Sequence, residues 1–277
     1  MILVTGGTGT IGTGFLLSQD NKAGYLVLTR KDPSILAGEI NAIRWNPPHI
    51  PQELSNYDIE GVIHLAGYPV WRIFSPFYFK KMRQSRIDTI LAIANFFRKQ
   101  GRKLKFLIGM SSIAIYHRWG YLKKLTEKWE MAYHHLTDVF ENITLLRTGI
   151  VISPYGGFVP LLVRYASSFR IVPVPYSKTF YWIDWTSLNR IIENSLNYPG
   201  GKIVFVNCFH RNPQSFPEAV RKILMFAAVR ALVLAVVPSP SYSIDWGNVR
   251  SIEDFTPQFP TFNETLNKLF IMKNESR

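Results

Sequence analysis

The sequence has one cysteine, few acidic residues and no apolar run long enough to cross a membrane. Because Cys208 stands alone, no disulfide can form within the chain, and we expect a reducing, cytoplasmic environment.

The longest apolar stretch, residues 223–237, is interrupted by Arg230 and falls short of the about 20 residues that a membrane-spanning helix needs, so we expect no transmembrane segment. We interpret it as a buried or half-buried helix, with a peripheral membrane contact or a partner surface as the alternative. No basic region precedes the first apolar run, which predicts that no signal peptide is present.

Acidic residues are scarce relative to basic ones, with 19 Asp and Glu against 32 Lys and Arg. Such an excess suits an anionic ligand such as a nucleotide phosphate, a nucleic acid or an acidic membrane surface. The cations are scattered, and their densest run, RKQGRKLK at 98–105, is typical of a solvated helix end and the turn after it. No basic helix or base-stacking motif accompanies the charge, which argues against nucleic acid as a partner. The 47% hydrophobic and 18% charged content indicates a compact globular protein.

Strand-like and helix-like segments alternate along the chain. Runs rich in β-branched and aliphatic residues stand at 2–5, 25–29, 61–65, 105–110, 143–147 and 203–207, and helical spacing occurs at 11–18, 77–99 and 123–139. This alternation predicts an α/β protein with a Rossmann-type, doubly wound parallel sheet and helices on both faces. In such folds the carboxyl ends of the strands share one edge, where we expect the ligand site.

The composition changes near Ser153, where PYGG at 154–157 is followed by VPVP at 172–175 and many aromatic residues. We expect a Rossmann domain over 1–153, with 181–207 rejoining it, and a smaller C-terminal substrate lobe within 154–277. Because the later segment returns to the first sheet in this prediction, no clean domain boundary is expected.

Glycines spaced GxxGxxG follow the first predicted strand directly and open the first predicted helix. In that context glycines allow a tight turn, close approach of a pyrophosphate to the backbone, and close packing of helix on strand. The helix N-terminus also offers unpaired N–H groups to phosphates. The residues expected to bind a dinucleotide cofactor here are Gly6, Thr8, Gly9, Thr10, Ile11 and Gly12. A glycine turn without a ligand is the alternative.

The end of the second predicted strand bears on the choice of cofactor. It carries Thr29, Arg30 and Lys31, with no acid before Asp32. A carboxylate at this place would bind the ribose hydroxyls of NAD, whereas two cations and a hydroxyl suit a 2′-phosphate. We therefore predict that Thr29 and Arg30 favour NADP over NAD, with two solvated surface cations as the alternative.

An ordered set of motifs resembles the short-chain dehydrogenase/reductase superfamily. It comprises VTGGTGTIG at 4–12, LTR at 28–30, VIHLAG at 62–67, KKMRQSRIDT at 80–89, SSIAIY at 111–116, EKWE at 127–130, LLRTGIVIS at 145–153 and YWIDW at 181–185. The likeness is to the extended, epimerase-like branch, and within it to an atypical group called nucleoside-diphosphate-sugar epimerase family proteins. It implies that Leu65, Ala66 and Gly67 line the adenosine and ribose side of the cofactor. It also puts Arg86 near an Asn that the branch often carries beside the active site, where a guanidinium could hold a phosphate or carboxylate, or be an ordinary helix cation.

The superfamily's chemistry uses a Ser, a Tyr and a Lys four residues after the Tyr, because residues at that spacing share a helix face. This sequence lacks a regular YxxxK pair. Tyr121 has Lys124 at an offset of three, which makes a degraded pair. The literal match, Tyr198 with Lys202, encloses Pro-Gly-Gly and is interpreted as a coincidence.

The remaining candidates are Ser112, which aligns with the family's serine, and Tyr116 four residues later. We predict that Ser112 orients the substrate and that Tyr116 transfers a proton. The atypical group's usual Tyr-Tyr-Gly is here Tyr116, His117 and Arg118, and the polar loop that follows is shortened to Trp119 and Gly120. His117 is either a general acid or base, or an exposed loop residue.

Other titratable residues give weaker signals. Asp184 stands where the group often has a His, and is either a substrate-lobe contact or a helix-capping acid. His134 and His135 are adjacent, so they face different sides of a helix and do not form a metal pair. With no set of Cys, His and acids at ligand spacing, we predict no metal site.

Two functions follow from these patterns. The first is an NADP(H)-binding oxidoreductase or epimerase-like enzyme that acts on a small or nucleotide-linked carbonyl or alcohol. The alternative is a catalytically weak or inactive NADP(H)-binding protein with a regulatory or interaction role, which the missing YxxxK pair favours. We expect a small-molecule substrate and a monomer or homodimer.

Overall fold

The computed structural model describes residues 1–36, 40–70, 77–176, 179–197, 203–210, 213–237, 241–244 and 259–275. The strands of this part are β1 (Ile2–Thr5), β2 (Tyr25–Thr29), β3 (Asn41–Arg44), β4 (Gly61–His64), β5 (Leu104–Ser112), β6 (Phe140–Thr148), β7 (Ile150–Ile152), β8 (Ile171–Pro175), β9 (Trp182–Asp184), β10 (Ile203–Cys208) and β11 (Leu232–Val237). The α-helices are α1 (Thr10–Leu17), α2 (Tyr78–Arg83), α3 (Thr89–Lys99), α4 (Tyr121–His134), α5 (Phe158–Phe169), α6 (Trp185–Leu196), α7 (Phe216–Phe226) and α8 (Phe262–Glu275).

The chain divides into two compact units. The first comprises Met1–Ser111, Leu125–Leu146 and Ile192–Phe205, and the second comprises Ser112–Lys124, Arg147–Ile191 and Val206–Arg277. Each unit is therefore assembled from segments that are distant in the sequence.

Seven strands form the central sheet, in the order β10-β6-β5-β4-β1-β2-β3. β1 pairs in parallel with both β2 and β4, β2 pairs in parallel with β3, and β4 with β5. The predicted Rossmann-type, doubly wound parallel sheet is confirmed. Because the chain leaves β1 toward β2 on one side and returns to β4 on the other, the strand order reverses between β1 and β4. In sheets of this kind ligands bind outside the carboxyl ends of the strands at such a point.

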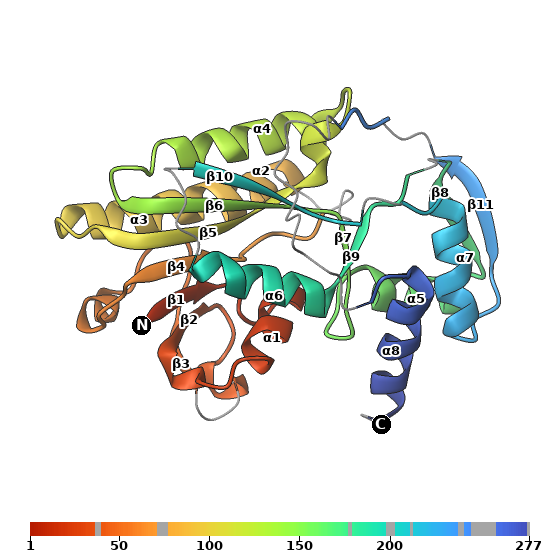
Figure 1. Cartoon of the computed structure of the whole chain (residues 1–277), viewed down its shortest axis with the longest axis horizontal. Coiled ribbons are helices and arrows are strands. Elements are labelled where there is room, and N and C mark those ends of the chain that lie inside the picture. Colours follow the sequence, from red (N-terminus) through yellow and green to blue (C-terminus); the bar gives the residue numbers. More distant parts are fainter. Residues whose placement is uncertain are drawn as a thin grey trace. The chain divides into compact units, whose positions relative to one another are not determined.

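The inner strands of this sheet are apolar on both sides. Leu3 and Val4 of β1, Val27 of β2 and Ile63 of β4 are fully buried. A parallel sheet covered by helices on both faces needs such continuous apolar strands. Figure 1 shows α1 on one face of the sheet and α3 on the other. α3 presents Ile90, Ile93, Ala94 and Phe97 to the core at helical spacing, all of them buried.

The predicted single helix over 77–99 is interrupted in its middle. α2 and α3 are joined by a π-helical turn, Gln84–Asp88, that contains Arg86. A π turn rotates the following residues relative to a regular helix, and such turns occur often at functional sites.

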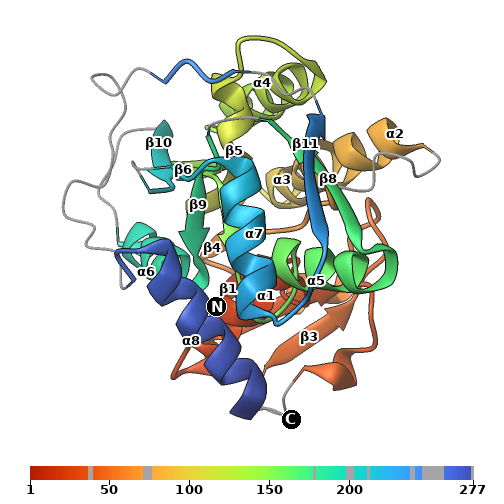
Figure 2. The same cartoon turned by 90° about the vertical axis from the view of Figure 1, so that its right-hand side faces the viewer.

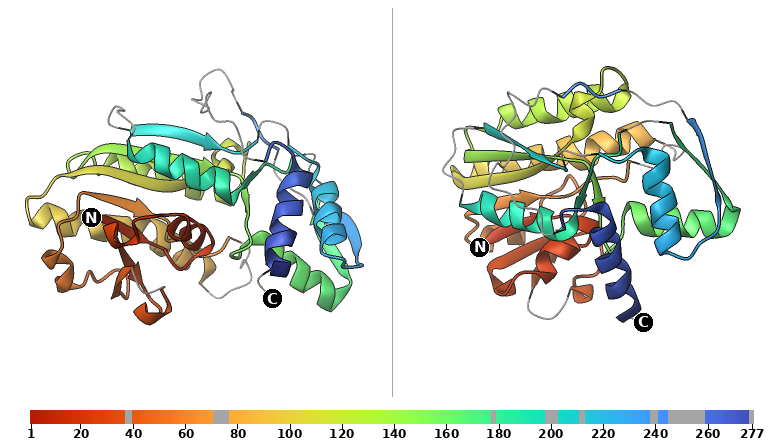
Figure 3. Two further views of the ribbon diagram at one scale, coloured as in Figure 1. Left: turned by 60° about the horizontal axis from the view of Figure 1, so that its bottom comes forward. Right: turned by 45° about the vertical axis from the view of Figure 1, so that its right-hand side comes forward.

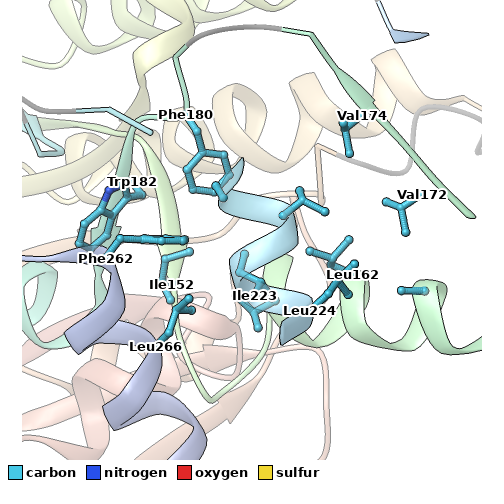
Figure 4. Packing of buried hydrophobic residues seen from close by; sticks show 14 of the residues in the cluster. Ile152, Leu162, Val172, Val174, Phe180, Trp182, Ile223, Leu224, Phe262 and Leu266 are labelled. Carbon is cyan, nitrogen blue, oxygen red and sulfur yellow. The ribbon is translucent and has the colours of Figure 1, made fainter. Parts of the chain in front are cut away.

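The second unit has its own apolar core, shown in Figure 4. β8 pairs in parallel with β11, and β7 with β9, as two separate two-stranded sheets. Figures 2 and 3 show α7 between α8 and the pair β8 and β11, and α7 contacts all three elements. The buried members of this core include Ile152, Leu162, Val172, Val174, Phe180, Trp182, Ile223, Leu224, Phe262 and Leu266.

The prediction of one helix over 223–237 is wrong. α7 ends at Phe226, Ala228 takes a left-handed φ of 53°, and β11 begins at Leu232. The run LVLAVV is rich in β-branched residues, which favour strands, and a short apolar run does not distinguish the two structures by its periodicity. Val233 packs inward from β11, whereas Leu232 is exposed. The alternative of a partner or membrane contact therefore stays a prediction. No helix within the described residues is long and apolar enough to span a membrane.

Candidate functional site

The glycine loop between β1 and α1 has a backbone that excludes side chains. Gly6 has a φ of +73°, and a Cβ there would lie 2.6 Å from the backbone nitrogen of Ala66. At Gly12 a Cβ would lie 2.4 Å from the carbonyl oxygen of Gly6 and 2.5 Å from the Cα of Gly7. The neighbouring atoms are backbone and cannot rotate away, so glycine is required at both positions.

The N-terminus of α1 lacks a side-chain cap. Gly9 precedes the helix, its N–H donates to the Gly6 carbonyl at 2.9 Å, and no acidic residue stands in the first turn. Thr10 and Ile11 lie in that turn, and both are half-buried, as is Thr8 in the loop. The first N–H groups of α1 therefore have no carboxylate partner within the helix. A helix N-terminus in this state attracts an anion, because its N–H groups are unpaired and carry a partial positive charge.

The loop after β4 lies against this glycine loop. The N–H of Leu65 donates to the Thr5 carbonyl at 3.0 Å, and a Cβ on Gly6 would touch the carbonyl carbon of Leu65. Leu65 and Ala66 are half-buried, and Gly67 is exposed. Two segments that the sequence separates by about sixty residues thus meet at the point where the strand order reverses.

The end of β2 presents two exposed cations, Arg30 and Lys31. The Thr29 hydroxyl is buried and accepts the N–H of Lys31 at 3.1 Å. The Asp32 carboxylate accepts the N–H of Ser34 at 2.9 Å, and this hydrogen bond lowers the pKa of Asp32. Asp32 therefore caps the following turn, and the Thr29 hydroxyl serves as a hydrogen-bond acceptor for the backbone two residues later.

A buried histidine links the end of β1 to the π turn. His64 Nδ1 is 2.7 Å from the Thr5 hydroxyl, and its Nε2 is 3.2 Å from the Arg86 carbonyl. Because a carbonyl only accepts, Nε2 carries the proton and Nδ1 accepts from Thr5. Burial lowers the pKa of His64 to about 4, so the ring is neutral near pH 7. His64 stands within the motif VIHLAG, whose spacing does not indicate these two partners.

Arg86 is buried rather than an ordinary helix cation, so that alternative is wrong. Its Nη1 donates to the Tyr68 carbonyl at 2.9 Å and to Met82 Sδ at 3.2 Å. Its guanidinium carbon lies 5.0 Å from the centre of the Trp129 ring. Burial lowers the pKa of Arg86 to about 10, which leaves it charged near pH 7.

The second unit brings Tyr116 together with two polar residues that the sequence analysis missed. The Tyr116 hydroxyl donates to Asn207 Oδ1 at 2.9 Å and accepts from Arg147 Nη1 at 2.9 Å. The Arg147 guanidinium also stands over the Tyr116 ring, 5.3 Å from its centre. Asn207 Nδ2 is buried without a partner in the described part of the chain. The chain has no regular YxxxK pair, and Arg147 places a cation at the phenolic oxygen of Tyr116.

The other catalytic candidates have different surroundings. Ser112 is half-buried, and its hydroxyl oxygen caps the short 3-10 helix Ile113–Tyr116 by accepting the Ala114 N–H at 3.1 Å. Tyr121 and Lys124 are both exposed on α4. The matching pair at 198 and 202 lies outside the described residues.

His117 is not an exposed loop residue. Its ring is buried against Tyr242 with 4.6 Å between ring centres, and burial lowers its pKa, assisted by Lys123. Backbone hydrogen bonds bind the same stretch to 241–243, from Arg118 N–H to the Ser241 carbonyl and from Ser243 N–H to the Tyr116 carbonyl. The short segment before α4 is therefore held by a part of the chain about 125 residues away.

Asp184 is the capping acid of α6. It is fully buried, and its Oδ1 accepts from the Ser187 N–H at 2.8 Å and the Thr186 hydroxyl at 2.5 Å. Its Oδ2 lies 4.0 Å from Nε2 of His210, whose ring stacks on Trp182 at 3.8 Å. Of the two interpretations from the sequence, the structure supports the cap. Within the described ranges, no group of three His, Cys, Asp or Glu side chains could hold a metal ion.

No family model matches the chain. An epimerase family protein of Staphylococcus saprophyticus is 24% identical over 219 residues, which cover 73% of each protein, and one of Staphylococcus haemolyticus is 22% identical over 206 residues. Among solved structures, the UDP-glucuronic acid 4-epimerase of Bacillus cereus, in complex with UDP-glucuronic acid and NAD, is 16% identical and superimposes with a TM-score of 0.79 over 100% of this chain and 99% of that one. The UDP-glucose 4-epimerase of Thermus thermophilus, in complex with NAD, gives 14% identity and a TM-score of 0.74 over the same shares. These likenesses show that the chain shares the Rossmann-type fold of the solved epimerases and that its sequence is similar to that of proteins named epimerase family proteins.

Proposed function

We propose that the protein is an NADP(H)-dependent oxidoreductase or epimerase that acts on a nucleotide-linked or small carbonyl or alcohol. The observation that carries the proposal is the glycine loop at the strand-order reversal, whose positions 6 and 12 admit no side chain. A backbone this bare can approach a pyrophosphate closely. When bound, the nicotinamide would carry the hydride.

The preference for NADP rests on the end of β2. Arg30 and Lys31 are exposed, and the nearest acid, Asp32, is already engaged with the backbone of Ser34. A ribose 2′-phosphate would therefore meet two exposed cations, while one oxygen of the Asp32 carboxylate is held by the Ser34 N–H. The B. cereus and T. thermophilus enzymes were solved with NAD, so the choice of nucleotide is a point on which this chain would differ from them.

The proton chemistry is assigned to the second unit. Tyr116 would give or take the proton of the substrate oxygen, and Ser112 would orient that oxygen with its own hydroxyl proton. Arg147 already donates to the Tyr116 oxygen and would balance the negative charge left when the proton moves to substrate. In the structure the Tyr116 hydroxyl donates its hydrogen bond to the side-chain carbonyl of Asn207. This hydrogen bond would hold the Tyr116 side chain in place until a substrate oxygen replaces the Asn207 carbonyl.

One observation favours the alternative of a nucleotide-binding protein with little catalysis. The Tyr116 hydroxyl is engaged on both its donor and acceptor sides, and Lys124 is exposed. Such a protein would gain stability from NADPH by linkage yet turn over no substrate.

Cofactor binding tests the first part of the proposal. We expect calorimetry to give tighter binding of NADPH than of NADH, and Arg30→Ala to weaken NADPH about 10- to 100-fold while leaving NADH unchanged, since one charge-assisted contact is lost. Lys103→Ala, which removes another exposed cation, is the matched control. Equal affinity of the wild type for both nucleotides would contradict the NADP preference.

Turnover tests the second part. A panel of UDP-sugars and small carbonyls should include a substrate, and Tyr116→Phe should lower its kcat about 100- to 10,000-fold, as expected for loss of a general acid or base. NADPH-dependent stabilisation with no turnover on any member of the panel would favour the interaction protein instead.

A further inference from the structure

Both faces of the parallel pair β8 and β11 are apolar. The two strands read IVPVP and LVLAVV and contain no polar residue. Val172, Val174 and Val233 are buried in the core that the pair shares with α7, and Figure 3 shows α7 on one side of the pair. Strands that are apolar throughout are typical of a sheet covered on both faces, so a partner is expected on the side away from α7.

The side away from α7 is exposed in the structure. We call it the β8–β11 face and define it by Ile171, Leu232, Leu234 and Val236, whose exposed fractions lie between 36% and 61%. Ile171 stands beside Leu232 in the strand pairing, and Leu234 stands beside Pro173, which is also exposed. Val236 lies at a register shift further along β11. These side chains form one aliphatic stripe, and contiguous patches of this kind mark protein or membrane contacts.

Two exposed arginines stand at the amino end of this stripe. Arg170 directly precedes β8, and Arg230 comes two residues before β11. Arg170 Nη1 donates to the Arg230 carbonyl at 3.2 Å, and the Leu232 N–H donates to the Arg170 carbonyl at 2.8 Å. Residues 158–183 and 219–244, which contain α5 and both strands, include no Asp or Glu. The charge of these segments is therefore positive, with no acid of their own to balance it.

Two aromatic side chains stand next to the arginines. α5 ends at Phe169, two residues before β8, and exposes both Tyr165 and Phe169, with 4.6 Å between their ring centres. Figure 3 shows α5 leading into the strand pair. Aliphatic side chains, aromatic rings and cations together are typical of protein surfaces that lie in the interface between membrane and water.

We propose that the β8–β11 face binds the surface of a lipid bilayer that carries anionic headgroups. The aliphatic side chains would enter the boundary between headgroups and acyl chains, and Arg170 and Arg230 would attract the negative headgroups. Charge complementarity selects this occupant, because cations in segments without acids favour a negatively charged surface. The inference goes beyond the proposed function and does not depend on a bound nucleotide.

A protein is less suited than a bilayer to cover this face. In a two-fold symmetric contact with a second copy, each face would meet a surface with the same excess of cations and no acids in these segments. A different protein partner typically makes about one hydrogen bond per 100–200 Å² of interface, whereas the outward side chains of both strands offer none. A bilayer needs no such hydrogen bonds from the side chains that enter it.

Vesicle sedimentation of the full chain tests the proposal. The probes are vesicles of phosphatidylcholine alone and of phosphatidylcholine with about 30% phosphatidylserine, which supplies the negative surface charge. The wild type should bind the anionic vesicles about 25-fold more tightly than the neutral ones, since each of two cations contributes about fivefold near such a surface. Added salt should weaken this binding by screening.

Two double substitutions locate the binding surface. Leu234→Thr with Val236→Thr keeps a strand-forming residue at both exposed positions and should weaken binding about 10- to 100-fold, because two aliphatic side chains no longer enter the bilayer. Arg170→Asn with Arg230→Gln should weaken binding to the anionic vesicles about 25-fold and leave binding to the neutral ones unchanged. Asn is chosen at position 170 because Arg170 has a left-handed φ of 59°.

Ile271→Thr and Lys268→Gln are the matched controls. Both residues are exposed on α8, which α7 separates from the strand pair (Figures 2 and 3). Each control should bind both kinds of vesicle as the wild type does. Every variant should keep the urea midpoint of the wild type, because all the substituted side chains are exposed. The dependence of wild-type binding on phosphatidylserine and salt needs no variant, so it stays decisive if one of them misfolds.

The proposal is overturned if the wild type does not sediment with anionic vesicles, or if it binds neutral vesicles equally well. It is also overturned if the Leu234→Thr, Val236→Thr variant binds as the wild type does. A wild type that forms oligomers without lipid, and that the same variant converts to monomers, would assign the face to a second copy instead. None of these results bears on nucleotide binding, so the proposed function stands or falls separately.

Discussion

His64 should make the stability of the protein depend on pH. The ring is fully buried, its Nδ1 accepts from Thr5, its Nε2 donates to the Arg86 carbonyl, and burial lowers its pKa from 6.5 to about 4, with a smaller contribution from the Arg86 charge. The unfolded chain therefore binds a proton between these two values that the folded chain does not. The neutral ring's contribution is fully present above about pH 6.5 and is lost as the pH falls toward 4. Linkage with these values gives a loss of about 2 kcal/mol between pH 7 and pH 5.

Urea unfolding of the wild type and His64→Gln at pH 7 and pH 5 measures this loss. Glutamine can keep a hydrogen bond to one partner but does not titrate, so the variant should start less stable at pH 7 and lose about 2 kcal/mol less than the wild type on acidification. His117 and His210, whose pKa values burial also lowers, contribute equally to both proteins and cancel in the comparison. His135→Gln, at an exposed position of the chain, should follow the wild-type curve. Parallel losses in the wild type and His64→Gln would refute the reasoning.

Three further substitutions test the fold. Gly12→Ala should abolish cofactor binding and lower the unfolding midpoint, because the added Cβ would lie 2.4 Å and 2.5 Å from backbone atoms. The control Gly24→Ala should leave both properties unchanged, because its Cβ would have its nearest contact at 3.5 Å. Phe180→Ala should cost about 3–5 kcal/mol of unfolding free energy, the range for a fully buried aromatic residue; a cost below about 1 kcal/mol would show that the core collapses around the gap. Asp184→Ala should destabilise by about 1–2 kcal/mol in chemical denaturation through loss of the α6 cap, and equal stability would argue against the capping role.

Six of the seven strands of the central sheet were predictable because their signals are local, whereas β3 was missed. The run at 25–29 is strand β2 with the same bounds, and the glycine spacing located both the end of β1 and the start of α1. The 223–237 prediction failed because the turn at Ala228 has no glycine or proline to mark it. The π turn was equally invisible, since one added residue within a helix leaves the apolar pattern of α3 intact.

The site was less predictable, since its partners are distant in the sequence. Arg147 and Asn207 reach the Tyr116 hydroxyl from 31 and 91 residues away, and neither stands at a recognisable spacing from it. The burial of Arg86 was likewise hidden, because a cation on a helical pattern is usually solvated. A histidine within the apolar run of β4 was the one available signal, since a polar residue in a buried strand needs partners.

Two properties of the proposed cofactor site, retention of a dinucleotide and the choice between nucleotides, depend on different residues. Positions 6 and 12 are closed to every side chain by backbone atoms, so under the proposed function the main chain would hold the dinucleotide there. Arg30 and Lys31 stand at an exposed strand end, where substitutions meet no packing constraint. Selection for a different nucleotide would therefore act on a few surface residues and leave the loop untouched. Under the proposed function, a change of nucleotide preference would cost little stability, whereas a side chain at position 6 or 12 would disturb the fold together with the site.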